Sequence, residues 1–142
     1  MVIGLIGENC AGKSTLVARI RDAIGAEVVT GRDYLRMAKS EAEARRLFRE
    51  KLAGAVSGGN IIYVISEPDQ LDLLPDGAVR ILVSADLDTI KARLRARMRG
   101  YLPAPVERML EGKHGMIDHC AYDYQYDGAN GDATALCEKL TQ

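Results

Sequence analysis

The pattern G-x-x-x-x-G-K-S constrains this chain more than any other feature of its sequence. An apolar run at residues 2–6 precedes the pattern, and residues 15–20 follow it with helical periodicity. A glycine-rich loop between a strand and a helix presents backbone N–H groups to an anion, and the helix N-terminus adds partial positive charge. We therefore predict a phosphate-binding loop for ATP, formed by Gly7, Glu8, Asn9, Cys10, Ala11, Gly12, Lys13, Ser14 and Thr15.

Three side chains of this loop have their own chemistry. The ammonium group of Lys13 adds a full positive charge beside the β- and γ-phosphates, and the hydroxyl of Ser14 is a ligand for Mg²⁺. Cys10 has two interpretations: a small loop residue without a role, or a thiol that oxidises readily near positive charge. The sequence thus predicts ATP and Mg²⁺ as cofactors.

Composition limits the class of protein. The chain has 142 residues, 47% of them hydrophobic and 27% charged, which suits one globular domain spanning residues 1–142. A net charge of −1 gives no basic field for nucleic acid or an anionic membrane. No apolar run reaches membrane-spanning length, no signal-peptide layout is present, and the three cysteines show no C-x-x-C spacing. We expect a cytoplasmic monomer or homodimer with reduced thiols.

Apolar and helical patterns alternate along the chain. The predicted strands are 2–6, 27–30, 61–65, 79–83 and, more weakly, 121–126. The predicted helices are 13–24, 33–39, 41–57, 71–74, 86–99, 105–111 and 132–140. Strands that alternate with helices imply crossover connections, and hence an α/β fold with a parallel sheet covered on both faces.

One break in composition interrupts this pattern. Glycine and two prolines at residues 100–105 end the arginine-rich helical pattern at 86–99. A loop beside so many arginines is typical of a mobile lid, but a plain turn between two helices fits the same residues.

The segment after the second predicted strand is a candidate for binding a second phosphate group. Parallel sheets bind ligands beyond the carboxyl ends of their strands, and residues 30–36 leave the sheet at that end. Thr30 offers a hydroxyl and Arg36 a planar guanidinium that binds phosphate bidentately. Asp33 is placed equally well as a helix N-cap or as a ligand contact.

Carboxylates follow the third predicted strand. An enzyme with a phosphate-binding loop needs an acidic group near Mg²⁺ to orient the ion or its waters. Glu67 and Asp69 are the two candidates, and Ser66 occupies the place directly after the strand.

The helical pattern at 86–99 carries a pair of arginines beside its apolar stripe. Arg93 and Arg97 are four residues apart and border the stripe, so both can reach inward over a bound triphosphate. A solvated basic helix face is the other interpretation of the same residues.

These motifs resemble the nucleoside monophosphate kinase superfamily, which includes the adenylate, cytidylate and guanylate kinases. The resemblance is carried by the loop 7–14, the run Thr30-Gly31-x-Asp33-x-Leu35-Arg36, and the pair Arg93-x-x-x-Arg97. Residues 122–127 are similar to the closing strand of guanylate kinases. The large insertion of guanylate kinases and the glycine-rich signature after the third strand of adenylate kinases are absent.

The resemblance implies a fold and a set of roles. It implies a three-layer α/β/α P-loop NTPase fold whose five parallel strands have the order 2-3-1-4-5, in agreement with right-handed crossovers. Acceptor-binding helices at about 31–58 and a short lid at about 99–112 would surround the site. Thr30 and Arg36 would hold a monophosphate, and the catalytic groups would be Lys13, Arg93, Arg97 and Arg108.

The predicted function is therefore transfer of the γ-phosphoryl group of ATP to a small molecule, first of all a nucleoside monophosphate. A kinase for a hydroxyl-bearing small molecule is the first alternative, with Asp33 as the base. A nucleotide-binding or NTP-hydrolysing regulator is the second, although the chain has no N-K-x-D motif. The two histidines, His114 and His119, are expected to be surface or packing residues.

Overall fold

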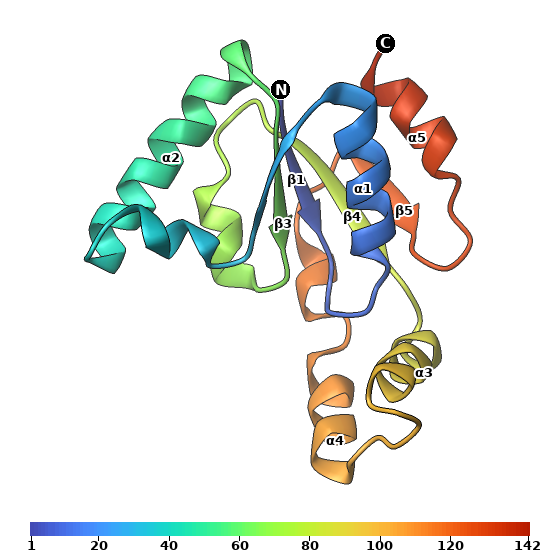
Figure 1. The fold of residues 1–142 in the computed structure, drawn as a ribbon. Helices are drawn as coiled ribbons and strands as arrows, with labels where there is room; N and C mark the ends of the chain where they lie inside the picture. Colours follow the sequence, from blue (N-terminus) through green and yellow to red (C-terminus); the bar gives the residue numbers. More distant parts are fainter.

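A computed structural model describes residues 1–142 and contains one five-stranded sheet. All neighbouring strands are parallel, and their order is β2-β3-β1-β4-β5 (Figure 1). This order confirms the predicted α/β class and topology. The strands are β1 (Val2–Ile6), β2 (Glu27–Thr30), β3 (Ile61–Ile65), β4 (Val79–Ser84) and β5 (Tyr124–Asp127).

The strand bounds follow the apolar pattern closely where burial is complete. Every residue of β1 and β3 is buried, and both strands begin and end where the sequence predicts. The weakly predicted last strand is wrong at its start, because β5 begins at Tyr124 rather than at residue 121. The side-chain carboxylate of Asp123 instead accepts a hydrogen bond from the backbone N–H of Arg80, 2.8 Å away.

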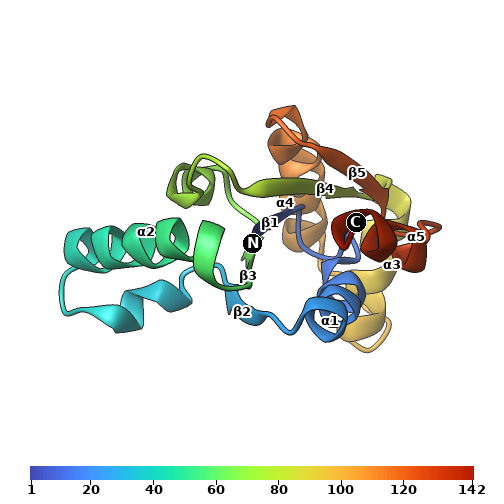
Figure 2. The same ribbon diagram turned by 90° about the horizontal axis from the view of Figure 1, so that it is seen from above.

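Alternation along the strands divides the core into two layers. Ile3 and Leu5 face α1 (Lys13–Ile24) and α5 (Ala133–Leu140), whereas Val2 and Ile6 face the opposite layer. Seen from above, the sheet runs between α2 on one side and α1 with α5 on the other (Figure 2). The three-layer arrangement follows from this alternation, because both faces of a parallel sheet are apolar.

The second layer is formed by α2 (Glu41–Gly58) and short helical turns. Phe48 on α2 stacks on Tyr34 with ring centroids 5.3 Å apart and meets Tyr63 of β3 edge-on at 4.8 Å. Ser40 caps α2, since its hydroxyl accepts a hydrogen bond from the backbone N–H of Glu43. These contacts fix the segment after β2 against the sheet.

Several helices differ from the predicted pattern. The segment 33–39 forms a short 3₁₀ helix, η1 (Asp33–Met37), and the predicted helix at 71–74 is part of the longer η2 (Pro68–Leu73). The long helix predicted at 86–99 is α3 (Leu87–Arg97), capped by Asp86. It ends where Arg99 and Gly100 adopt positive φ angles of 62° and 89°. A further 3₁₀ helix, η3 (Met116–His119), was not predicted.

Helices α3 and α4 (Ala104–Lys113) form a hairpin that projects beyond the carboxyl ends of the strands (Figure 1). Lys91 on α3 donates hydrogen bonds to Glu107 at 3.2 Å and Glu111 at 2.6 Å on α4, and these bonds raise its pKa. The segment with glycine and prolines is therefore a turn between two helices. No helix of the structure is both long and apolar enough to cross a membrane.

The aromatic cluster on α2 gives a test of the fold. We expect Phe48→Ala to lower the free energy of unfolding by roughly 3–5 kcal/mol, because it leaves a cavity between Tyr34 and Tyr63. Tyr101→Ala, at a side chain that is 71% exposed, should change it by no more than about 0.5 kcal/mol. Urea denaturation measures both, and equal losses would contradict this packing.

Candidate functional site

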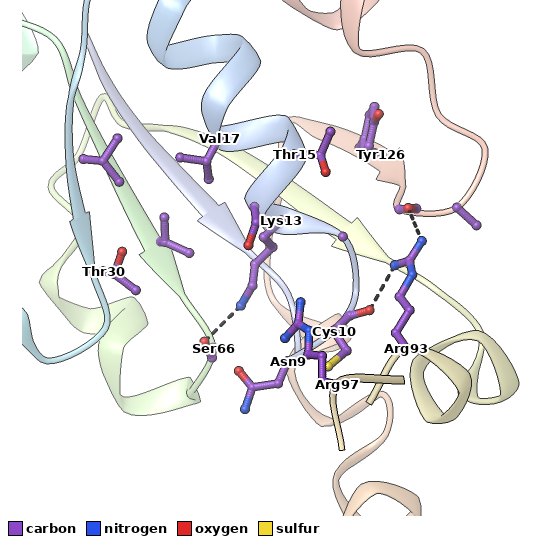
Figure 3. Close-up of a pocket in the computed structure, with 16 residues that line it drawn as sticks. Asn9, Cys10, Lys13, Thr15, Val17, Thr30, Ser66, Arg93, Arg97 and Tyr126 are labelled. Carbon is purple, nitrogen blue, oxygen red and sulfur yellow. Dashed lines mark hydrogen bonds between the residues drawn. The ribbon is translucent and has the colours of Figure 1, made fainter. Parts of the chain in front are cut away.

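A cavity of about 660 Å³ lies at the carboxyl ends of the strands, around the N-terminus of α1 (Figure 3). Phosphate-loop residues form its floor. Thr30 at the end of β2 and Ser66 directly after β3 line one side. Arg93 and Arg97 of α3 and the loop between β5 and α5 line the other. The topology thus brings together residues that are more than a hundred positions apart in the sequence.

Two glycines allow the phosphate loop and the β5–α5 loop to touch. Gly12, at the N-cap of α1, adopts a φ of 109°, a backbone conformation that residues with a side chain rarely adopt. A Cβ atom on Gly128 would lie 1.6 Å from the carbonyl oxygen of Ala11. Any larger residue at position 128 would therefore separate the two loops.

Lys13 lies at the centre of the cavity floor and is only 8% exposed. Its ammonium group donates hydrogen bonds to the carbonyl oxygen of Gly7, to that of Ile65 at 3.2 Å and to the hydroxyl of Ser66 at 2.9 Å. Burial disfavours the charged form and lowers the pKa of Lys13 to about 8. The group is thus a desolvated cation without a bonded carboxylate, which suits a polyphosphate ligand.

Arg93 joins the two loops rather than pointing freely into the cavity. Its guanidinium donates to the carbonyl oxygen of Cys10 at 3.0 Å and to that of Gly128 at 2.7 Å (Figure 3). Cys10 itself has a positive φ of 66°, so the bond holds the phosphate loop in a sparsely populated conformation. The structure therefore gives Arg93 a positioning contact that the sequence pattern did not indicate.

The other two predicted arginines lie differently. Arg97 lines the cavity, makes no hydrogen bond within the protein, and points its guanidinium toward the phosphate loop (Figure 3). Arg108 is an exposed residue of α4 and lines none of the three main cavities. The α3–α4 hairpin thus places one unpaired guanidinium beside Lys13.

Glu8 connects the phosphate loop to the end of α4. Its Oε1 lies 2.7 Å from Nδ1 of His114, and its Oε2 accepts a hydrogen bond from the backbone N–H of Gly115 at 3.0 Å. His114 is thus a partly exposed residue, as expected, but it also makes a specific contact with the phosphate loop. The one hint of this contact in the sequence is Glu8 itself, an acidic residue within a loop whose other features favour anion binding.

Neither predicted metal carboxylate lines the large cavity. Asp69 pairs with Arg32 at 3.1 Å, and Glu67 lies 3.6 Å from Lys113 of α4. No group of three or more His, Cys, Asp or Glu side chains in the structure is arranged to hold a metal ion. Ser14 is the predicted metal ligand that lines the cavity. This donor set fits Mg²⁺ that is held mainly by phosphate oxygens and water.

The predicted acceptor residues are divided between two surfaces. Thr30 lines the large cavity, whereas Asp33 and Arg36 line a separate depression of about 280 Å³ that includes Glu27 and Lys51. The expectation that Asp33 is an N-cap is wrong, because Arg32 occupies the cap position and Asp33 is the first residue of η1. The segment turns after Thr30, and this turn carries Arg36 away from the cavity.

Comparisons with known proteins agree with this fold. No protein-family model and no curated protein sequence matches the chain. Among solved structures, an unliganded sugar kinase from Janibacter sp. HTCC2649 matches with a TM-score of 0.66 and 17% identity, over 98% of this chain and 91% of that one. Shikimate kinase from Acinetobacter baumannii in complex with shikimate matches with a TM-score of 0.61 and 16% identity, over 99% and 90%.

A third match has a different ligand. The YorR protein from Bacillus subtilis, in complex with phosphorylated GDP, gives a TM-score of 0.60 and 20% identity, over 99% of this chain and 94% of that one. At these identities the likeness concerns the fold. The chain has the α/β fold of P-loop kinases.

The lowered pKa of Lys13 gives a test by pH. The group binds a proton more weakly when folded (pKa about 8) than at its ordinary value of 10.5, so the unfolded chain holds more protons between these values. Stability of the wild type should therefore rise with pH in this window, relative to Lys13→Met, by roughly 3 kcal/mol. Urea denaturation of both proteins from pH 7 to 10.5 measures the difference. A constant difference would show that Lys13 is not desolvated.

Proposed function

We propose that this protein transfers the γ-phosphoryl group of ATP to a hydroxyl group of a small molecule. The observation that carries the proposal is the convergence of Lys13, Ser14 and Arg97 in one cavity at the carboxyl end of the sheet. Parallel α/β sheets bind ligands at this end. A buried ammonium, an unpaired guanidinium and the N-terminus of α1 together suit the charge of a triphosphate.

In the proposed reaction, the acceptor oxygen bonds to the γ-phosphorus while the bond from that phosphorus to the β–γ bridging oxygen breaks. ADP leaves, and the hydroxyl proton passes to water, because no carboxylate lines the large cavity. Lys13 and Arg97 neutralise the charge on the transferred group, and Arg93 holds the loop in place through Cys10 and Gly128. Mg²⁺, bound through Ser14 and the phosphates, would supply further charge neutralisation.

Two observations support a hydroxyl acceptor. The sugar kinase and the shikimate kinase to which this chain is similar are named for hydroxyl-bearing compounds. Arg36, the residue expected to hold an acceptor monophosphate, lies at the separate depression beside Glu27 and Lys51. Asp33, which the sequence suggests as the proton acceptor, lies at the same depression as Arg36 and therefore outside the large cavity.

A nucleoside monophosphate kinase is the second candidate. Thr30 lines the cavity of the phosphate loop, as the adenylate-type resemblance implies. The similarity to the YorR protein with its bound phosphorylated GDP also favours a nucleotide. In this case Arg36 would have to move toward the cavity when the acceptor binds. A nucleotide hydrolase that acts as a regulator is distinguished by ADP release that no acceptor stimulates.

The activity is tested by ADP release with Mg²⁺, ATP and a panel of sugars, sugar acids, shikimate and nucleoside monophosphates. We expect one hydroxyl-bearing acceptor to stimulate release, and Lys13→Ala to lower the stimulated rate by roughly a hundredfold or more with the fold intact. Lys139→Ala, an exposed lysine of α5, is the matched control and should retain the rate. Full turnover by Lys13→Ala would contradict the assignment.

Two variants separate the acceptor classes in the same assay. Asp33→Asn should leave turnover of a hydroxyl acceptor unchanged, because the Asp33 carboxylate lies outside the cavity. Loss of that turnover would identify Asp33 as the proton acceptor. Arg36→Ala should raise the KM for a monophosphate more than that for ATP. A hydroxyl acceptor should be insensitive to Arg36→Ala, because the guanidinium lies outside the cavity.

A further inference from the structure

A second, smaller cavity adjoins the phosphate loop on the side of α4. Its volume is about 90 Å³, equal to roughly three water molecules in the liquid. Asn9 of the phosphate loop and Ser66 after β3 line both this cavity and the large one. The hydroxyl of Ser66 accepts a hydrogen bond from Lys13 at 2.9 Å. The junction of the two cavities therefore lies beside the ammonium group that would hold the transferred phosphate.

The charged side chains of the small cavity are two carboxylates and one ammonium group: Glu8, Glu67 and Lys113. Lys113 lies 3.6 Å from Glu67, so its charge is already matched. Glu8 is held by Nδ1 of His114 and the backbone N–H of Gly115. No unmatched cation lines this cavity, whereas Lys13 and Arg97 both line the large one.

This distribution of charge gives the two cavities different preferences for charged ligands. A buried anionic group is costly unless a cation or several N–H groups pair with it. Carboxylates accept hydrogen bonds from hydroxyl and ammonium donors and repel phosphate or carboxylate groups. Methionine and leucine side chains of α4, Met109 and Leu110, form an apolar part of the same wall.

Resting on the proposed function, we infer that the small cavity receives the reacting end of the acceptor, and that this acceptor is an uncharged or amine-bearing hydroxyl compound. Glu67 selects it by accepting a hydrogen bond from a hydroxyl or ammonium group. Glu8 is fixed in orientation by His114, and this contact holds the end of α4 against the phosphate loop. Sugar acids and nucleoside monophosphates are disfavoured because they would bring an anion to two carboxylates, and the one ammonium group of the cavity, that of Lys113, already pairs with Glu67.

The test compares three charge classes of acceptor by ADP release from the full chain with Mg²⁺ and ATP: neutral polyols and sugars, amino sugars, and the anions gluconate, shikimate, AMP and GMP. We expect the highest kcat/KM for a neutral or amine-bearing compound. Glu67→Gln should lower it about tenfold, the usual effect of losing a hydrogen bond to a charged group. Glu67→Lys should shift the preference toward anionic compounds. Glu138→Lys, at an exposed residue of α5 that lines neither cavity, is the control and should leave the preference unchanged.

The possible outcomes distinguish the two proposals. A highest kcat/KM for an anion, or an unchanged preference in Glu67→Lys, overturns the inference about the small cavity and leaves the phosphotransferase intact. ADP release that no compound of any class stimulates contradicts the phosphotransferase itself. Lys113→Gln removes the ammonium group that lines the small cavity and should lower kcat/KM for anionic compounds further, whereas a gain for anions would overturn the inference.

Discussion

The buried ammonium group of Lys13 is the interaction on which the rest of the site depends. Parallel pairing of β1 with β3 brings the ends of the two strands together, so that the backbone N–H of Gly7 donates to the carbonyl oxygen of Ile65 at 3.0 Å. Lys13, the first residue of α1, donates hydrogen bonds to the carbonyl oxygens of both Gly7 and Ile65. A cation in this position is desolvated and has no carboxylate bonded to it, which is unfavourable in isolation. A polyphosphate that binds there would compensate this cost.

The phosphate loop keeps its shape through contacts from distant parts of the chain. Arg93 from α3 and Gly128 from the β5–α5 loop meet at the carbonyl oxygens of Cys10 and Ala11. Glu8 joins the same loop to the end of α4. Both helices of the α3–α4 hairpin are thus attached to the phosphate loop, α3 through Arg93 and α4 through the contact of His114 with Glu8. A displacement of the hairpin would therefore change the loop.

The sequence predicts much of the fold but less of the site. Continuous apolar runs rich in β-branched residues locate β1 and β3 correctly, because every residue of those strands is buried. The glycine-rich loop is predictable because its backbone geometry needs particular residues at fixed positions. Asp33 and Asp69 are different: their side chains lie on short 3₁₀ turns whose direction depends on packing against the sheet. Local sequence does not encode that direction. The partner of Glu8, His114, lies 106 positions away and only the tertiary structure brings the two together.

We propose that backbone N–H groups of the loop and Lys13 hold the phosphate tail of a nucleotide. Phosphorus NMR of ADP with Mg²⁺ tests it most directly, since the β-phosphate would lie against the loop and the adenosine would not. We expect a shift of the β-phosphate resonance on addition of the wild-type protein, and loss of that shift with Lys13→Ala. An unshifted resonance with wild-type protein at millimolar concentration would contradict it.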